Sequence, residues 1–227
     1  MTSDIVAAEV AEAFAELVTR AAAAGRRFHC AVPGGSVAAK VFPRIACQAL
    51  PWSIVEISLA DERFVDPEHP DSNARAVREH WLDRLDDVRP MFHPMPTIGV
   101  NVDEAARMAS AVLCASAGTP PRLDLVILGV GPDGHVASLF PHLPGWRDSP
   151  DWVLAVHDAP KPPALRLSLG LATLAASREI WFVAFGPEKA AAVAEARGMP
   201  QSPLPVAVVA RSGPQVRWFL DRAASAP

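Results

Sequence analysis

The sequence has no tyrosine, only three cysteines in 227 residues, and no apolar run approaching the roughly 20 residues that cross a bilayer. Cys30, Cys47 and Cys114 lie in apolar segments without C-x-x-C spacing, which argues against a disulfide framework or a thiolate metal site. We therefore expect buried free thiols in a reducing compartment and a cytoplasmic location. Acidic residues such as Glu9 and Glu12 interrupt the alanine-rich N-terminal stretch, which argues against a secretory or transit peptide.

The chain also lacks an excess of positive charge, because its formal net charge is -4 at pH 7. No overall basic field would attract nucleic acid or anionic lipid, so we expect neither a nucleic acid nor a membrane as partner. With 50% hydrophobic and 20% charged residues, the chain reads as one globular α/β domain over residues 1–227, a monomer or a weak homo-oligomer. Any anion-binding site must therefore depend on a local cluster of cationic or hydrogen-bond-donating groups.

Apolar strand-like runs alternate with helical patterns along the chain. Strands that are apolar on both faces predict a mostly parallel sheet flanked by helices on both faces, a modified Rossmann-like α/β fold. The expected strands are residues 27–32, 53–60, 123–130, 152–159, 165–169, 180–186 and 206–210. One helix is expected to begin after residues 2–4. Further helices are expected over residues 36–50, 72–85, 101–118, 187–198 and 216–225.

Polar clusters follow several of these strands, and in such sheets ligands bind at the carboxyl ends of the strands. After the first strand, Gly34 and Gly35 allow close backbone approach to a ligand, and Ser36 opens a helix with a hydroxyl and free amides. This arrangement receives phosphate in many folds, although a plain strand-to-helix turn is the structural alternative.

Three cations lie at or just beyond strand ends: Arg63, Arg166 and Lys189. Converging cations favour a phosphate dianion through charge-assisted hydrogen bonds. Asp61, at the end of the second strand, is placed to orient a histidine or to bind a sugar hydroxyl. A local ion-pair cluster is the alternative for residues 61–63.

The stretch "LDLVILGVGPDGHVASLFP" contains three glycines in the G-x-G-x-x-G spacing of dinucleotide-binding proteins. That interpretation fails because Pro132 removes an amide, and the following helix could run for only about six residues, too short for a crossover. The stretch is instead predicted to be a turn that holds Asp133 and His135. At the start of a helical stretch the dipole disfavours a charged imidazole, so His135 is a candidate base that a carboxylate such as Asp133 orients.

The remaining histidines show no H-x-x-x-H spacing, so the sequence predicts no metal site. Covalent catalysis by Ser36 or Ser138 is disfavoured because neither serine lies in a G-x-S-x-G elbow.

Together these motifs resemble the 6-phosphogluconolactonase family in chain order and over nearly the whole sequence. The resemblance is carried by VPGGS, ADERFV, DSNARAV, the long glycine stretch quoted above, KPPALRLSL, GPEKAAAV and the final PVAVVA…VRWFLDRAAS. The related glucosamine-6-phosphate deaminases share the GxxDGH turn, but they follow the histidine with Asn-Glu-Pro, whereas this chain has VASLFP. One departure is that Val37 and Ala38 follow Ser36, where lactonases often have Thr-Pro.

The resemblance implies a sugar-phosphate isomerase/deaminase-like fold, no metal or organic cofactor, and a phosphorylated sugar lactone as substrate. The implied reaction is hydrolysis of 6-phospho-D-glucono-1,5-lactone to 6-phospho-D-gluconate in the oxidative pentose phosphate pathway, with His135 as base. The alternatives are a glucosamine-6-phosphate deaminase or isomerase, which would use Asp61 for proton transfer, and a non-catalytic sugar-phosphate sensor.

Overall fold

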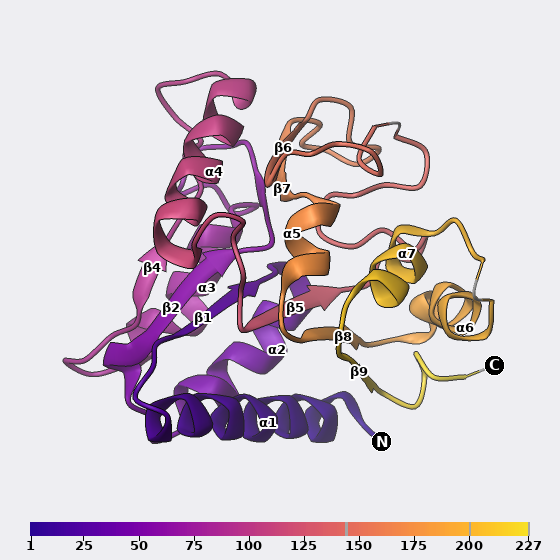
Figure 1. Cartoon of the computed structure of the whole chain (residues 1–227). Helices are drawn as coiled ribbons and strands as arrows, with labels where there is room; N and C mark the ends of the chain where they lie inside the picture. Colours follow the sequence, from indigo (N-terminus) through magenta and orange to yellow (C-terminus); the bar gives the residue numbers. More distant parts are fainter. Residues whose placement is uncertain (144, 200, 227) are drawn as a thin grey trace.

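The structure is a computed structural model that describes residues 1–143, 145–199 and 201–226, and it contains two β-sheets with helices packed around them (Figure 1). The α-helices are α1 (Ser3–Ala23), α2 (Gly35–Ala46), α3 (Asn73–His80), α4 (Val102–Ala117), α5 (Leu171–Ala176), α6 (Ala190–Gly198) and α7 (Pro205–Ser212). Short 3-10 turns are η1 (Trp52–Ile54), η2 (Leu82–Arg84) and η3 (Pro187–Lys189). The strands are β1 (Phe28–Val32), β2 (Val55–Leu59), β3 (Asp61–Arg63), β4 (Met91–His93), β5 (Leu125–Gly129), β6 (Val153–Val156), β7 (Arg166–Leu169), β8 (Ile180–Ala184) and β9 (Val216–Leu220).

The larger sheet has the strand order β4-β2-β1-β5-β8-β9, and every neighbouring pair is parallel. Every residue of β1, β2 and β8 is buried, as expected for strands covered on both faces. In Figure 1, α1 lies along the lower face of this sheet, and α4 and α5 lie above it. The predicted fold class, a mostly parallel sheet flanked by helices on both faces, is confirmed.

The strand order reverses between β1 and β5. From β1 the chain builds outward through β2 to β4, and it then returns to the other side of β1 and builds outward through β5, β8 and β9. The loops that leave β1 and β5 therefore diverge, and this divergence opens a crevice at the carboxyl ends of the two strands.

The smaller sheet is antiparallel, with the order β3-β7-β6. β3 begins two residues after β2 ends, so the chain passes directly from the large sheet to the small one. Asp61 of β3 pairs with Ser168 of β7, and Arg63 pairs with Arg166. The small sheet thus carries three of the predicted site residues next to the carboxyl end of β2.

Side-chain caps begin the helices that the sequence indicated. Thr2 Oγ1 accepts a hydrogen bond from the Ile5 amide at α1, and Asn101 Oδ1 accepts one from the Glu104 amide at α4. At α3 the cap is Ser72, whose Oγ accepts from the Arg75 amide. The side chain of Asn73 is therefore available to contact Asp61.

Two sequence predictions near the C-terminus are wrong. Residues 206–210, expected as a strand, belong to α7, which begins with Pro205; a short apolar run that is buried on all sides has no periodicity to distinguish helix from strand. Residues 216–220, expected as part of a helix, form β9 at the edge of the large sheet. Trp218 stacks on Phe182 of β8 with ring centroids 4.5 Å apart, and this tertiary contact decides the strand.

The thiol prediction is correct only in part, because Cys30 is buried, Cys114 is half-buried and Cys47 is exposed. Burial raises the pKa of the Cys30 thiol, so this group stays protonated. Among the described residues, no helix combines the length and apolar character needed to cross a membrane.

Candidate active site

A pocket of about 260 Å³ occupies the crevice at the carboxyl ends of β1, β5 and β8, with β3 and β7 forming another wall. Eight of the predicted site residues line it: Gly34, Gly35, Ser36, Asp61, Arg63, His135, Arg166 and Lys189. The ninth, Asp133, contacts His135 directly. Residues from five separate stretches of chain therefore meet at one cavity.

The Asp133–His135 pair is built on the tight turn after β5. The Gly134 amide donates to the Gly131 carbonyl at 3.0 Å, and the Gly131 amide donates to the His135 carbonyl at 2.8 Å. His135 Nδ1 lies 2.5 Å from Asp133 Oδ1. Burial acts to raise the pKa of Asp133, but the hydrogen bond from His135 outweighs it and lowers this pKa to about 2.

An ionised Asp133 accepts a hydrogen bond, so the proton of the neutral imidazole lies on Nδ1 and the lone pair is on Nε2. The ring of Phe140 lies against that imidazole with centroids 4.7 Å apart. Phe140 is held in turn, because its carbonyl accepts a hydrogen bond from Trp146 Nε1 at 3.0 Å. The imidazole is therefore oriented from one edge by a carboxylate and from one face by an aromatic ring.

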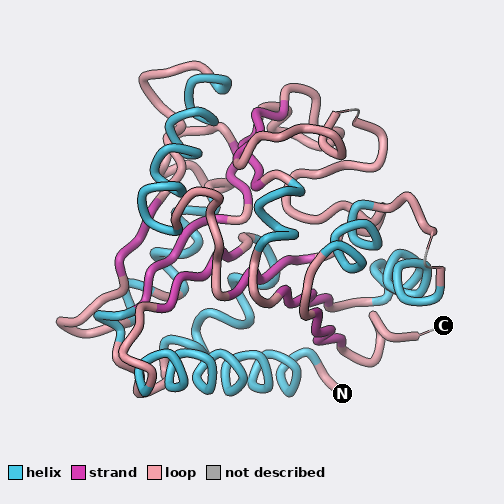
Figure 2. The backbone as a smooth tube through the Cα atoms, in the orientation of Figure 1, coloured by secondary structure: helices cyan, strands magenta, loops and turns pink. Residues whose placement is uncertain are grey.

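The sequence predicted that His135 begins a helical stretch whose dipole disfavours a charged imidazole. This prediction is wrong, because no helix begins at this residue. The chain after β5 continues as turns and loop in Figure 2, with an isolated bridge between Val136 and Leu139. Ala137 has a φ of 49°, in the left-handed region, which is incompatible with continuing an α-helix. Contact with Asp133, and not a helix dipole, orients the imidazole.

The glycine loop leads directly into α2. Gly34 is the N-cap residue, and Gly35 has a φ of 62°, a conformation that glycine adopts without strain. A Cβ atom on Gly34 would overlap the side-chain oxygen of Asn73, so only glycine allows this close approach. The first amides of α2 have no carbonyl partner within the helix, and the residues of this first turn, Gly35, Ser36 and Val37, line the pocket.

Among the described lining residues, Asp61 carries a carboxylate and four residues carry cations, namely Arg63, Lys161, Arg166 and Lys189. Arg63 and Arg166 are cross-strand partners, so their side chains leave the small sheet side by side. Burial lowers the pKa of Lys189, Glu188 opposes this shift, and the nearby cation of Lys161 adds to it. Crowded cations of this kind repel one another, and an anion in the pocket offsets that repulsion.

Asp61 is held in place by its neighbours. Ser138 Oγ donates to Asp61 Oδ2 at 2.7 Å, and Asn73 Nδ2 donates to Asp61 Oδ1 at 3.1 Å. Asn73 is fixed by Glu62, a buried carboxylate that accepts a hydrogen bond from the Asn73 amide at 2.7 Å. Ser138 is itself buried and donates to a carboxylate, so the structure agrees with excluding it as a nucleophile.

Sequence reasoning missed several lining residues, among them Asn73, Phe140 and Lys161. Each of these three lies within a motif that carried the family resemblance, so a signal was present. Sequence analysis placed Asn73 inside the helix expected at 72–85 and Lys161 two residues after the strand expected at 152–159, and it assigned neither residue to the site. The backbone carbonyl of Lys161 accepts a hydrogen bond from Arg166 at 3.0 Å, and this contact brings residue 161 to the pocket.

The fold and the pocket define a class of α/β proteins with a cationic cavity at the strand-order reversal and a histidine–carboxylate pair on its rim. A family model described as glucosamine-6-phosphate isomerases/6-phosphogluconolactonase matches residues 1–218. The 6-phosphogluconolactonase of Mycobacterium tuberculosis is 36% identical, with 99% of this chain and 94% of that protein covered. The human 6-phosphogluconolactonase is 37% identical, covering 96% of this chain and 89% of that protein.

Solved structures agree with these relatives. The crystal structure of a 6-phosphogluconolactonase from Shewanella baltica superposes with a TM-score of 0.85 at 28% identity, covering 96% of this chain and 94% of that one. The chain belongs to the glucosamine-6-phosphate isomerase/6-phosphogluconolactonase family, and within it to the 6-phosphogluconolactonases. The family predicted from the sequence motifs is confirmed.

Gly131→Ala is expected to displace the Asp133–His135 pair. The added Cβ would overlap His135 Nδ1 and would lie 2.7 Å from Asp133 Oδ1, too close for both side chains to stay in place. Since misplacing a reacting group by about 1 Å can cost on the order of 100-fold in rate, turnover should fall by about that factor while the fold persists. Gly198→Ala is the matched control, because a Cβ at Gly198 meets nothing within 4 Å. Equal turnover in the two variants would contradict this reading of the turn.

The ionisation of Asp133 provides a second test. Carbon-detected NMR should show its carboxyl titrating at a pKa of about 2 in the wild type, and at a higher value in His135→Ala, because the hydrogen bond that lowers this pKa is gone. Glu79, whose pKa is lowered by the hydrogen bond from Arg75, is the internal reference and should not respond to that change. An unchanged Asp133 titration in the variant would show that the pair is not formed in solution.

Proposed function

We propose that the pocket hydrolyses 6-phospho-D-glucono-1,5-lactone to 6-phospho-D-gluconate, with the phosphate at the cationic wall and the lactone carbonyl at His135. The observation that carries the proposal is the single 260 Å³ pocket lined both by the imidazole and by four cations. A cavity of this size lies near the lower end of the range of about 300–1,000 Å³ typical for small-molecule sites, which suits a phosphorylated monosaccharide. The lactonase relatives support the choice of substrate.

The phosphate would bind at the glycine loop, where Gly34, Gly35 and Ser36 present backbone amides and a hydroxyl. Arg166 and Lys189 would supply charge-assisted hydrogen bonds to its oxygens. The Val37-Ala38 sequence after Ser36 removes a hydroxyl that lactonases often have there, and the free amides of the first turn of α2 offset the loss. Binding at this end fixes the ring within the cavity.

At the other end, Nε2 of His135 would remove a proton from a water molecule as that water attacks the lactone carbonyl carbon. Asp133, ionised throughout the neutral range, holds the imidazole in the tautomer that this step needs and stabilises the imidazolium that forms. The C–O bond to the ring oxygen then breaks, and the imidazolium returns its proton to that oxygen. A lactone is already an activated ester, so no covalent intermediate is required.

The charge that develops on the carbonyl oxygen needs a hydrogen-bond donor. The Gly131 and Gly134 amides are already committed within the turn, and Pro132 has no amide hydrogen. Arg63 is the stronger candidate, because its Nε is buried without a hydrogen-bond partner among the described residues and its side chain lines the pocket. Asp61, held by Ser138 and Asn73, would position this wall of the pocket rather than transfer protons.

The competing deaminase function would need Asp61 as a base at carbon. In this chain both oxygens of the Asp61 carboxylate accept hydrogen bonds, and Val136 to Pro141 replace the Asn-Glu-Pro sequence that deaminases have after the histidine. A non-catalytic sensor would have no use for an oriented imidazole on the pocket rim. The proposed base, its orienting carboxylate and the phosphate-binding groups all belong to this chain, so the proposed reaction requires no residue of a second copy. We also propose a cytoplasmic location, which suits a sugar-phosphate substrate.

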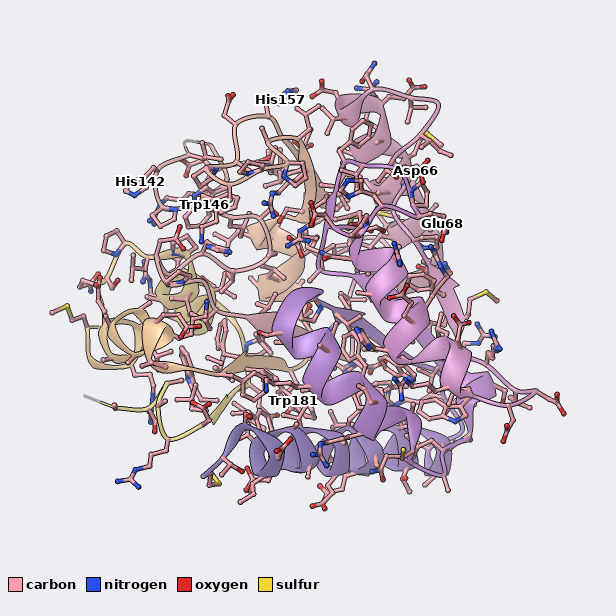
Figure 3. The ribbon with its side chains drawn as sticks, turned by 180° about the vertical axis from the view of Figure 1, so that it is seen from behind. Asp66, Glu68, His142, Trp146, His157 and Trp181 are labelled. Carbon is pink, nitrogen blue, oxygen red and sulfur yellow. The ribbon has the colours of Figure 1, made fainter. Side chains whose placement is uncertain are left out.

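His135→Ala should lower the rate of acid release from freshly generated lactone by about 100- to 10,000-fold relative to the wild type, once uncatalysed hydrolysis is subtracted. His157→Ala is the matched control, because His157 also contacts a carboxylate, Asp103, at 3.0 Å, but lies at the periphery of the molecule in Figure 3. A His135 variant as fast as this control would exclude His135 as the base. Ammonia release from glucosamine 6-phosphate by the wild type would establish the deaminase instead.

Lys189→Ala should raise the KM for the phosphorylated lactone by about 10- to 100-fold, the range expected when a charge-assisted hydrogen bond is lost, with little effect on the unphosphorylated lactone. Arg44→Ala removes a cation from the far end of α2, where Arg44 pairs with Asp4 on the surface, and should leave both values unchanged. The same KM change for both lactones would contradict a phosphate-binding role for Lys189.

A further inference from the structure

A second group of chemically active side chains lies near the amino ends of the central strands, away from the proposed active site. His29 is the second residue of β1, Glu56 the second residue of β2, and His93 the last residue of the short edge strand β4. His29 and Glu56 are register partners, and His93 is the register partner of Ser58, two residues beyond Glu56. Side chains in register or two residues apart share a face, so all three project on the same side of the sheet.

The three side chains converge on one point. Glu56 Oε2 lies 2.8 Å from His93 Nε2, and His29 Nε2 lies 2.9 Å from Ser58 Oγ. The two imidazole centroids are 5.5 Å apart, and one ligand atom from each of His29, Glu56 and His93 lies within 4.8 Å of the others. A zinc-class ion binds such atoms at about 2.0–2.2 Å, so small side-chain rotations would bring all three into its coordination sphere.

Burial of His29 and hydrogen bonding to Glu56 leave these two groups in the forms that bind metals. His29 is 5% exposed and Glu56 is 6% exposed. Burial lowers the pKa of His29 to about 4, so its imidazole is neutral near pH 7 and no proton competes for its lone pair. Burial acts to raise the pKa of Glu56, but hydrogen bonds from His93 and Arg27 reverse this and lower it, so the carboxylate is ionised.

The hydrogen bonds within this group leave one buried side-chain nitrogen without a well-formed hydrogen bond. Within the described part of the chain, His29 Nδ1 is buried and makes no hydrogen bond of normal geometry, although the backbone of Ser116 lies close enough to His29 to affect its pKa. A buried nitrogen left unpaired costs about 1–3 kcal/mol. The His93 side chain is 19% exposed, so an ion can enter from the edge of the sheet.

We propose that His29, Glu56 and His93 form a binding site for one divalent transition-metal ion of the zinc class. The two imidazoles and the carboxylate supply three ligands, and water completes a four-coordinate shell. The ion would join β1, β2 and β4, and so would fasten a three-residue edge strand to the central sheet. Because the strands separate it from the proposed active site, its role would be structural.

The test is a titration of the metal-free full-length protein with Co²⁺, followed by its visible absorption, and with Zn²⁺, followed by calorimetry and the thermal unfolding midpoint. We expect one ion per chain, the intense absorption of four-coordinate Co²⁺, and a midpoint that rises with Zn²⁺ concentration. Loss of an outer partner of a metal ligand already costs about 10- to 100-fold in affinity, so His93→Ala and Glu56→Gln should each weaken binding at least that much.

Three further variants locate the ion. His135→Asn and His157→Ala remove histidines that contact carboxylates elsewhere and should leave the affinity unchanged. Arg27→Ala removes the cation that pairs with Glu56, so it should tighten binding at this site. Binding that survives His93→Ala, binding lost in His135→Asn, or no saturable binding at all would overturn the proposal.

Discussion

The parallel pairing of β1 with β5 is the constraint on which the site depends. Because the chain builds away from β1 in one direction and later resumes on its other side, the loops after Val32 and Gly129 separate instead of crossing over one another. The helix amides of the glycine loop and the imidazole of His135 therefore face one cavity. β8, paired with β5, extends the same edge and brings Lys189 to it. The strand order opens the cavity, and the side chains determine only what lines it.

Close backbone packing then sets the fine geometry. Gly131 leaves the space that the Asp133–His135 pair occupies, and Gly34 leaves the space for Asn73. Asn73 reaches that space because Glu62, buried beneath it, accepts hydrogen bonds from the Asn73 and Ala74 amides at the start of α3. A buried carboxylate, an amide side chain and a second carboxylate, Asp61, thus form a chain of contacts behind the pocket wall. Rigidity of this kind holds a base and its partner in place without help from the ligand.

The two ends of the same strands carry different chemistry. At the carboxyl ends, diverging loops expose cations and an imidazole to a cavity. Near the amino ends, His29 and Glu56 lie side by side within the packed sheet, where burial keeps one neutral and neighbouring donors keep the other ionised. Strand register explains both groupings, because it brings side chains from distant parts of the chain to the same level of the sheet.

The sequence by itself determined the elements whose signals are local. It predicted the strand–glycine–helix start of β1 and α2, the helices α1 and α4, and the turn that holds Asp133 and His135, since glycines and apolar periodicity act over a few residues. It did not distinguish α7 from a strand or β9 from a helix, because short apolar runs take their form from their neighbours. Only the tertiary structure decided that Asn73, Phe140 and Lys161 line the pocket, that Asp133 rather than a helix dipole orients His135, and that His29, Glu56 and His93 meet. Contacts of that kind depend on strand order and register, and no local pattern in the chain encodes either.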